Sequence, residues 1–162
     1  MTGFEYSLAG LMLQNGYISE GEQMVAAIRD RYDGEKRNPW NEIECGSNYA
    51  RSMASFALMN IYSGFSFGMT KKNIGFDPIK KGAGRFFWSV GETWGTVTFT
   101  DGVVRLKVLG APLDLAVFGI GNGRCAASVT ADGRAVDFSQ RGCHLFFTSD
   151  ITIIDSLEIA LS

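Results

Sequence analysis

Apolar side chains recur with a helical period along the first third of the chain. They predict a helix over residues 4–15, which Gly16 ends because a left-handed residue is favoured just after a helix. Ser19 and Glu22 form an S-x-x-E capping box, so a second helix is expected to start near Glu20. Two helices joined by so short a loop predict an antiparallel helical hairpin.

A third helix is predicted over residues 47–63, after a polar loop at 34–46. Small and large apolar residues alternate along it, and Arg51 is its single charged residue. A helix with almost no charged face is buried on most sides. The pattern therefore indicates an inner helix of an array that needs more helices than this chain supplies.

The pattern changes near residues 64–84, and the second half alternates with the period of β-strands. Asp101-Gly102 predicts a two-residue hairpin turn of type I′. The resulting register pairs Phe99 with Val104, Val97 with Leu106 and Gly95 with Val108. This register gathers apolar residues on one face of the hairpin, which supports the pairing. The opposite face carries Thr96, Thr98, Arg105 and Lys107.

A second hairpin is predicted at Asp132-Gly133, with Val129 opposite Val136 and Ala127 opposite Phe138. Further strands are expected at 84–90, 113–120, 143–148 and 151–160. About six to eight short antiparallel strands predict a small sandwich or curled sheet. The chain then divides into a helical segment at 1–65, a connector at 66–84 and an antiparallel β lobe at 85–162, which together make an α+β fold.

Composition narrows the class of partner. The chain has 162 residues, of which 46% are hydrophobic, so it can fill a core. Its net charge is −2, and it lacks the basic face that a nucleic-acid partner requires. No apolar run approaches the roughly 20 residues of a membrane-spanning helix, so no membrane span is expected.

The three cysteines are Cys45, Cys125 and Cys143. Their odd number and the lack of a C-x-x-C spacing argue against a disulfide framework and against a zinc site. Free thiols fit a reducing compartment, so the sequence predicts a cytoplasmic protein without a metal or cofactor. His144, beside Cys143, is expected to be a core or edge histidine rather than a ligand or base.

Candidate chemistry is concentrated between residues 37 and 51. Glu42 and Glu44 lie two apart, so their side chains point to the same side of an extended backbone. A retaining glycosidase places two carboxyl groups about 5–5.5 Å apart on opposite sides of the sugar bond, which excludes this pair as the catalytic couple. Either glutamate can bind sugar hydroxyls together with Arg51, or simply pair with Arg51 and fix the loop.

Four segments resemble glycoside hydrolase family 116, the β-glucosidase and non-lysosomal glucosylceramidase family. They are Met-Thr-Gly-Phe-Glu-Tyr at 1–6, Arg-Asp-Arg-Tyr-Asp-Gly at 29–34, Arg-Asn-Pro-Trp-Asn-Glu-Ile-Glu-Cys-Gly at 37–46 and Tyr-Ala-Arg-Ser-Met-Ala-Ser at 49–55. The resemblance is to the C-terminal part of the family, covers about residues 1–80 and keeps the order and spacing of the motifs. The β half resembles the tail of some bacterial members.

The resemblance implies helices from an (α/α)6-type barrel, followed here by a small antiparallel sheet or sandwich. It also implies a retaining mechanism on β-glucosides whose catalytic carboxyl groups lie in family segments upstream of those present, so no residue of this chain is expected to be catalytic. Glu42 and Arg51 match family residues that hold glucose hydroxyls, and Trp40, Asn41 and Glu44 are expected to support them. A family histidine contact is not expected, because this chain has Ser47-Asn48 there.

Two other interpretations stay open. The β half could be a non-catalytic carbohydrate-binding module that stacks a sugar on Trp88 or Trp94, although core packing also accounts for these residues. The chain could instead be a structural lobe that caps a barrel. Because one small sheet cannot cover three largely apolar helices, we also expect either dimerisation through the helices or their folding back onto the sheet.

Overall fold

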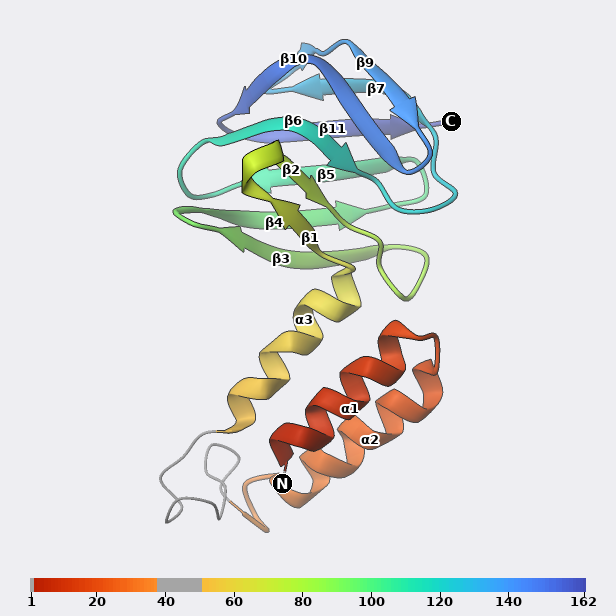
Figure 1. Cartoon of the computed structure of the whole chain (residues 1–162), viewed down its shortest axis with the longest axis vertical. Helices are drawn as coiled ribbons and strands as arrows, with labels where there is room; N and C mark the ends of the chain where they lie inside the picture. The colour runs from red at the N-terminus through yellow and green to blue at the C-terminus, as the bar shows by residue number, and fades with distance from the viewer. Residues whose placement is uncertain (1, 38–50) are drawn as a thin grey trace. The chain divides into compact units, whose positions relative to one another are not determined.

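The computed structural model describes residues 2–37 and 51–162. The chain forms two compact units, Met1–Tyr62 and Ser63–Ser162. The first unit is helical and the second is built of β-strands (Figure 1). The boundary between the two units falls between Tyr62 and Ser63.

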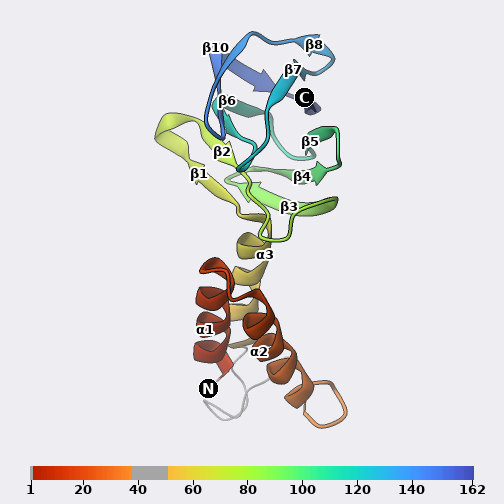
Figure 2. The ribbon, with the colours of Figure 1, turned by 90° about the vertical axis from the view of Figure 1, so that its right-hand side faces the viewer.

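The helical unit contains α1 (Thr2–Gln14), α2 (Ile18–Arg31), a 3-10 turn η2 (Arg51–Ser55) and α3 (Phe56–Ser63). The helices α1 and α2 lie side by side as the predicted hairpin (Figure 2). Gly16 lies between them with φ +86°, a conformation that suits glycine after a helix, as predicted. The predicted capping box is wrong, because α2 begins at Ile18 and its N-cap residue Tyr17 makes no side-chain capping bond.

Close contacts at small residues hold the helices together. Ala9, Leu13 and Ile28 are buried in this unit. Gly10 and Gly21 leave no room for a β-carbon, because one at Gly10 would lie 2.7 Å from Ile61 Cδ1 and one at Gly21 would lie 2.8 Å from Leu13 Cγ. Gly10 and Gly21 therefore permit a close approach of neighbouring helices.

The β unit consists of two facing sheets. The five-stranded sheet has the order β1 (Ser66–Gly68), β2 (Asn73–Gly75), β6 (Leu113–Gly119), β10 (His144–Ile153) and β9 (Phe138–Arg141). The six-stranded sheet has the order β3 (Gly84–Val90), β4 (Thr93–Phe99), β5 (Val103–Val108), β11 (Ser156–Leu161), β7 (Ala126–Ala131) and β8 (Arg134–Ala135). A 3-10 turn η3 (Met69–Lys71) joins β1 to β2.

Alternate residues of both sheets fill one core. In the six-stranded sheet Trp88, Val97 and Leu106 point inward, and in the other sheet Leu115 and Leu145 do so. Burial of each large apolar side chain stabilises the fold by about 1.5–3 kcal/mol. The sheet pleat sends the intervening residues outward, so the same alternation creates a polar outer face.

The register predicted for the first hairpin is confirmed. Gly95 pairs with Val108, Val97 with Leu106 and Phe99 with Val104. Its predicted type I′ turn is wrong, because neither Asp101 nor Gly102 has a positive φ. The Thr100 hydroxyl instead accepts a hydrogen bond of 3.1 Å from the Val103 N–H and donates one of 3.0 Å to the Val103 carbonyl.

The second hairpin has the predicted turn, since Asp132 and Gly133 have φ of +48° and +76°. Val136 N donates to the Val129 carbonyl, in agreement with the predicted register. The expected pairing of Ala127 with Phe138 is wrong, because Phe138 pairs with Phe147 in the five-stranded sheet. The chain therefore crosses from one sheet to the other just after β8.

The predicted fold class is wrong. The described residues contain three α-helices and two sheets of five and six strands, with no (α/α)6 barrel and no single small sheet. A barrel of six helical pairs needs far more helices than α1, α2 and α3 provide. The β part is larger than expected because residues within 66–84 form β1, η3 and β2, and β2 pairs in parallel with β6. The architecture is mostly a β-sandwich, with a short helical unit before it in the chain.

Candidate functional site

The sugar-binding residues expected from the sequence fall mainly outside the described part of the chain. Trp40, Asn41, Glu42 and Glu44 lie there. Arg51 is the first residue of η2, but the description does not extend to its side chain. The structure therefore neither brings Glu42 and Arg51 together nor separates them, and their role stays a prediction.

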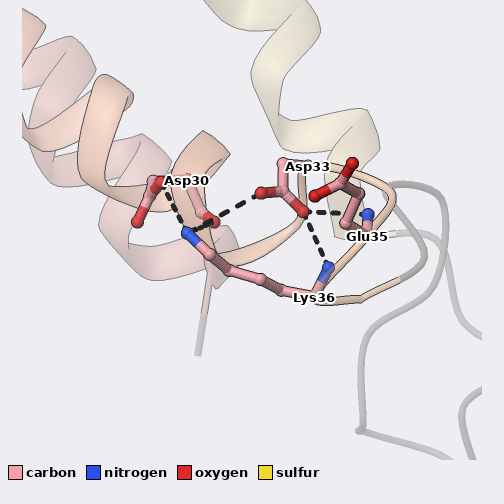
Figure 3. Close-up of polar contacts among 4 residues, drawn as sticks. All are labelled: Asp30, Asp33, Glu35 and Lys36. Atoms are coloured by element: carbon pink, nitrogen blue, oxygen red, sulfur yellow. Dashed lines mark hydrogen bonds and ion pairs between the residues drawn. The ribbon is translucent and has the colours of Figure 1, made fainter.

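The turn that leads from α2 toward this segment is built by Asp33 (Figure 3). Its Oδ1 accepts hydrogen bonds of 3.0 Å from the Glu35 N–H and 2.8 Å from the Lys36 N–H. The Lys36 ammonium donates to Asp30 Oδ1 at 2.7 Å. The Lys36 N–H bond is the main cause of a lowered pKa at Asp33, and the bond to Asp30 raises the pKa of Lys36. These polar contacts fix the chain direction after the helix.

The two tryptophans proposed as sugar platforms have opposite environments. Trp88, on β3, is only 1% exposed and belongs to the core between the sheets. Trp94, on β4, is 44% exposed on the outer face of the six-stranded sheet. Of these two, only Trp94 is accessible to a sugar.

Trp94 forms an apolar platform with two neighbours, Phe87 and Leu109, each 50% exposed. The Phe87 and Trp94 ring centroids lie 6.4 Å apart, with an angle of 38° between the planes. Leu109 follows β5, and its N–H donates to the Trp94 carbonyl at 2.8 Å. Exposed apolar side chains that gather in this way mark binding surfaces more often than isolated ones do.

A polar groove of about 430 Å³ lies on the same outer face. Side chains from four strands and the turn before β11 line it, among them Arg85, Thr96, Thr98, Arg105, Lys107 and Glu158. Phe87 is directly opposite Thr96 across β3 and β4, so the aromatic pair adjoins the groove. We call the platform and groove together the outer-sheet surface.

Ion pairs hold the charged groups of the groove in place. Arg105 Nε lies 3.0 Å from Glu158 Oε1, and Lys107 pairs with Asp155. The hydrogen bond from Lys107 holds the pKa of Asp155 below its usual value. Arg85 Nη2 donates to Thr96 Oγ1 at 3.5 Å, the longest of these contacts. The groove thus presents both donors and acceptors, which suits a ligand rich in hydroxyl groups.

Much of this surface was already encoded in the predicted hairpin, which put Thr96, Thr98, Arg105 and Lys107 on one face. Phe87 and Glu158 were not among the residues predicted for a site. Phe87 stands between Phe86 and Trp88 in a predicted strand. Successive strand residues point to opposite faces of a sheet, so the middle aromatic residue must face the side opposite to the other two. Glu158 carries no such signal, since it reaches Arg105 only through the pairing of β11 with β5.

Three further features of the described residues concern His144, metal ligands and membrane-spanning helices. His144 is exposed on β10, with Nδ1 3.4 Å from Cys143 Sγ. Those residues contain no group of three or more His, Cys, Asp or Glu side chains arranged to hold a metal ion. In the same ranges, no helix combines the length and the hydropathy needed to cross a membrane.

Comparison with known proteins gives structural similarity only. No protein-family model and no curated protein matches the sequence. A solved glycoside hydrolase aligns with 73% of this chain at 16% identity and a TM-score of 0.42, and a GH127 β-arabinofuranosidase aligns with 78% at 14% identity and a TM-score of 0.41. The aligned part is about a fifth of each of those chains, 20% and 22%. At TM-scores below 0.5, neither similarity carries an argument about the activity of this chain.

Proposed function

We propose that this chain is a non-catalytic, carbohydrate-binding portion of a glycoside hydrolase, and that its β unit holds a glycan on the outer-sheet surface. The observation that carries the proposal is the exposed Phe87–Trp94 pair beside a groove lined with hydroxyl, guanidinium and carboxylate groups. This is the binding-module interpretation of the sequence, with Trp94 and not Trp88 as the platform.

The chemistry of a sugar ring matches both parts of the surface. A pyranose has an apolar C–H face, which an exposed aromatic ring can cover and so remove from water. Its hydroxyl groups both donate and accept hydrogen bonds, as Arg105, Glu158 and Thr98 can from the groove. Bonds to charged groups are stronger than bonds between neutral groups, so these residues would orient the chain of sugars.

Titration calorimetry with cellohexaose and laminarihexaose tests this proposal. We expect at least one oligosaccharide to bind the full chain, and Trp94→Ala or Phe87→Ala to weaken binding at least about tenfold, or 1.4 kcal/mol. Phe146→Ala is the matched control, because Phe146 is another exposed aromatic side chain but belongs to the five-stranded sheet. It should bind like the unchanged protein.

Absence of heat with both oligosaccharides would reject the outer-sheet surface as a glucan site. Equal loss of binding in Phe146→Ala and Trp94→Ala would also reject it, since a specific platform cannot depend on both. Thermal unfolding of each variant checks that the fold is retained.

We also propose a second sugar contact, in which Glu42 and Arg51 hold glucose hydroxyls with support from Trp40, Asn41 and Glu44. The support for this proposal is the set of four family 116 motifs in residues 1–55. The substrate would be a β-glucoside, and the acid/base and nucleophile would come from other segments of a retaining β-glucosidase or glucosylceramidase. A structural role for the Glu42–Arg51 pair is the alternative.

Two measurements on the full chain test this second contact. A β-glucoside assay should give no turnover, and hydrolysis that survives Glu42→Ala would overturn the assigned roles. Glucose affinity should fall about tenfold or more in Glu42→Gln, which removes the charged acceptor, and in Arg51→Lys, which removes the planar fork of donors. Glu35→Gln, in the preceding exposed turn, is the control and should change nothing. Variants that alter only thermal stability would favour the structural role.

A further inference from the structure

One cation of the polar groove has no acidic partner. Arg85, on β3, is exposed, and its guanidinium forms no ion pair with any described residue. Its side chain donates only to the neutral Thr96 hydroxyl, over a long 3.5 Å. The other two cations of the groove, Arg105 and Lys107, are each paired with a carboxylate. The described lining of the groove therefore carries one positive charge in excess, and it belongs to Arg85.

The sheet register places this unpaired guanidinium beside the aromatic pair. Arg85 and Phe87 lie two residues apart on β3, so both side chains are on the outer face. Thr96 is directly opposite Phe87 on β4, and Arg85 Nη2 reaches toward it. The guanidinium therefore leans along the strand toward the Phe87–Trp94 pair, at the border between the platform and the groove.

The charges of the groove are unevenly distributed across the sheet. Thr98 is directly opposite Arg85 on one side and Arg105 on the other. Glu158 follows on β11, opposite Arg105. The β11 end of this row thus carries a carboxylate, whereas the β3 end carries only a cation. Because the whole chain has a net charge of −2, a preference for an anion here must come from Arg85 and not from the overall charge.

A carboxylate attached to a sugar ring fits this position. A guanidinium holds a carboxylate through two parallel N–H···O bonds, which are stronger than bonds between neutral groups. In a hexuronic acid the carboxylate is bonded directly to C5 of the ring, so a ring that stacks on Phe87 can present it to Arg85. A neutral hexose offers only a hydroxyl group at the same place, which is a weaker acceptor.

We propose that the outer-sheet surface prefers glycans that contain hexuronic acid, with the uronate carboxylate held by Arg85 and its ring stacked on the Phe87–Trp94 pair. This inference rests on the proposed function, because it names the class of glycan that the same surface binds. The aromatic pair contributes affinity for any sugar ring, and Arg85 determines the preference for an acidic one.

Titration calorimetry of the full chain with two matched ligands tests the inference. Cellohexaose and the hexamer of β-1,4-linked D-glucuronate differ only at C6, which is a hydroxymethyl group in the first and a carboxylate in the second. The buffer contains about 0.15 M salt, which screens repulsion between the anionic hexamer and the distant charges of the chain. We expect the glucuronate hexamer to bind about three- to fivefold more tightly, as for an exposed ion pair of good geometry.

Arg85→Gln should abolish this preference, so that both hexamers bind with the same Kd, while the Kd for cellohexaose stays nearly unchanged. Arg134→Gln is the matched control, because Arg134 is an exposed arginine on β8, at the opposite edge of the same sheet. It should retain the full preference. Thermal unfolding checks that both variants keep the fold, as expected for exposed side chains.

Equal Kd values for the two hexamers in the unchanged chain would overturn the inference and leave the proposed function intact. A preference that survives Arg85→Gln would overturn it as well. So would binding of the glucuronate hexamer that Trp94→Ala leaves unchanged, since the acidic glycan would then lie elsewhere on the chain. Absence of heat with cellohexaose, laminarihexaose and the glucuronate hexamer would reject the proposed function itself.

Discussion

Asp132 ties two turns of the β unit together from an unusual backbone position. Its Oδ2 accepts a hydrogen bond of 2.9 Å from the Ile154 N–H, and its Oδ1 accepts bonds of 2.8 and 2.9 Å from the Asp155 and Ser156 N–H groups. Partial burial alone would raise the pKa of Asp132, but the three backbone donors outweigh it, so the pKa lies below the ordinary 3.8. The carboxylate is therefore more favourable in the folded chain than in the unfolded one.

This linkage predicts a pH-dependent contribution to stability. Because the folded pKa is lowered, the contribution is complete above the unfolded value near 3.8 and is lost as the pH falls through the folded value. Asp132→Ala should lower the free energy of unfolding by about 2 kcal/mol at neutral pH, from the lost bonds and from the cost of a positive φ at alanine. Urea unfolding measured from pH 7 down to pH 2 should show the difference shrinking in acid.

Asp101→Ala provides the comparison, because Asp101 belongs to the other Asp-Gly turn and makes no side-chain hydrogen bond to a described residue. Its unfolding profile should keep the acid dependence of the unchanged chain. If Asp132→Ala lost the same stability at pH 2 as at pH 7, the charged carboxylate would not be the cause.

Trp88 and Trp94 lie on the neighbouring strands β3 and β4 but on opposite faces of the sheet. Trp88 pairs with Gly95, and Ser89 pairs with Trp94, so the two indoles belong to adjacent rows of the sheet. The pleat sends adjacent rows to opposite faces. One indole therefore fills the core, and the other is left for a ligand.

At the scale of the element, α1 has two apolar faces. Tyr6, Ala9 and Leu13 are buried within the helical unit, whereas Phe4, Leu8 and Leu11 are exposed. The exposed residues follow a spacing of four and then three, which places them along one stripe of the helix. An exposed apolar stripe favours association with another surface.

We therefore expect the chain to self-associate through this stripe of α1. The double variant Leu8→Lys/Leu11→Lys should shift sedimentation velocity profiles from dimer to monomer, because it places two charges in the contact. Leu109→Lys introduces the same change at an exposed leucine of the β unit and should leave the dimer intact. A monodisperse monomer across the accessible concentration range of the unchanged chain would contradict the expectation.

At the scale of the whole molecule, pairings between distant segments assemble the β unit and its outer-sheet surface. The parallel pairing of β2 with β6 places Asn73 opposite Val117 and Ile74 opposite Phe118. The pairing of β11 with β5 brings Glu158 to Arg105. Each pairing joins segments at least about 40 residues apart in the chain.

Local chemistry in the sequence determined the hairpins and the polar side of the sheet. The Asp-Gly turns, the strand alternation and Gly16 predicted the pairing of β4 with β5, the first pairs beside the Asp132 turn and the helical hairpin. These features depend on residues a few positions apart, whose backbone preferences act before any tertiary contact forms.

Only the tertiary structure decided the architecture and the candidate site of the β unit. The glycine- and lysine-rich stretch at 66–84 gave no strand signal, because β1 and β2 have three residues each and pair with distant partners. Likewise, Phe138 does not pair within its predicted hairpin. It belongs to the five-stranded sheet, where it pairs with Phe147. Short strands have weak intrinsic preference, so burial against the rest of the fold determines where they pair.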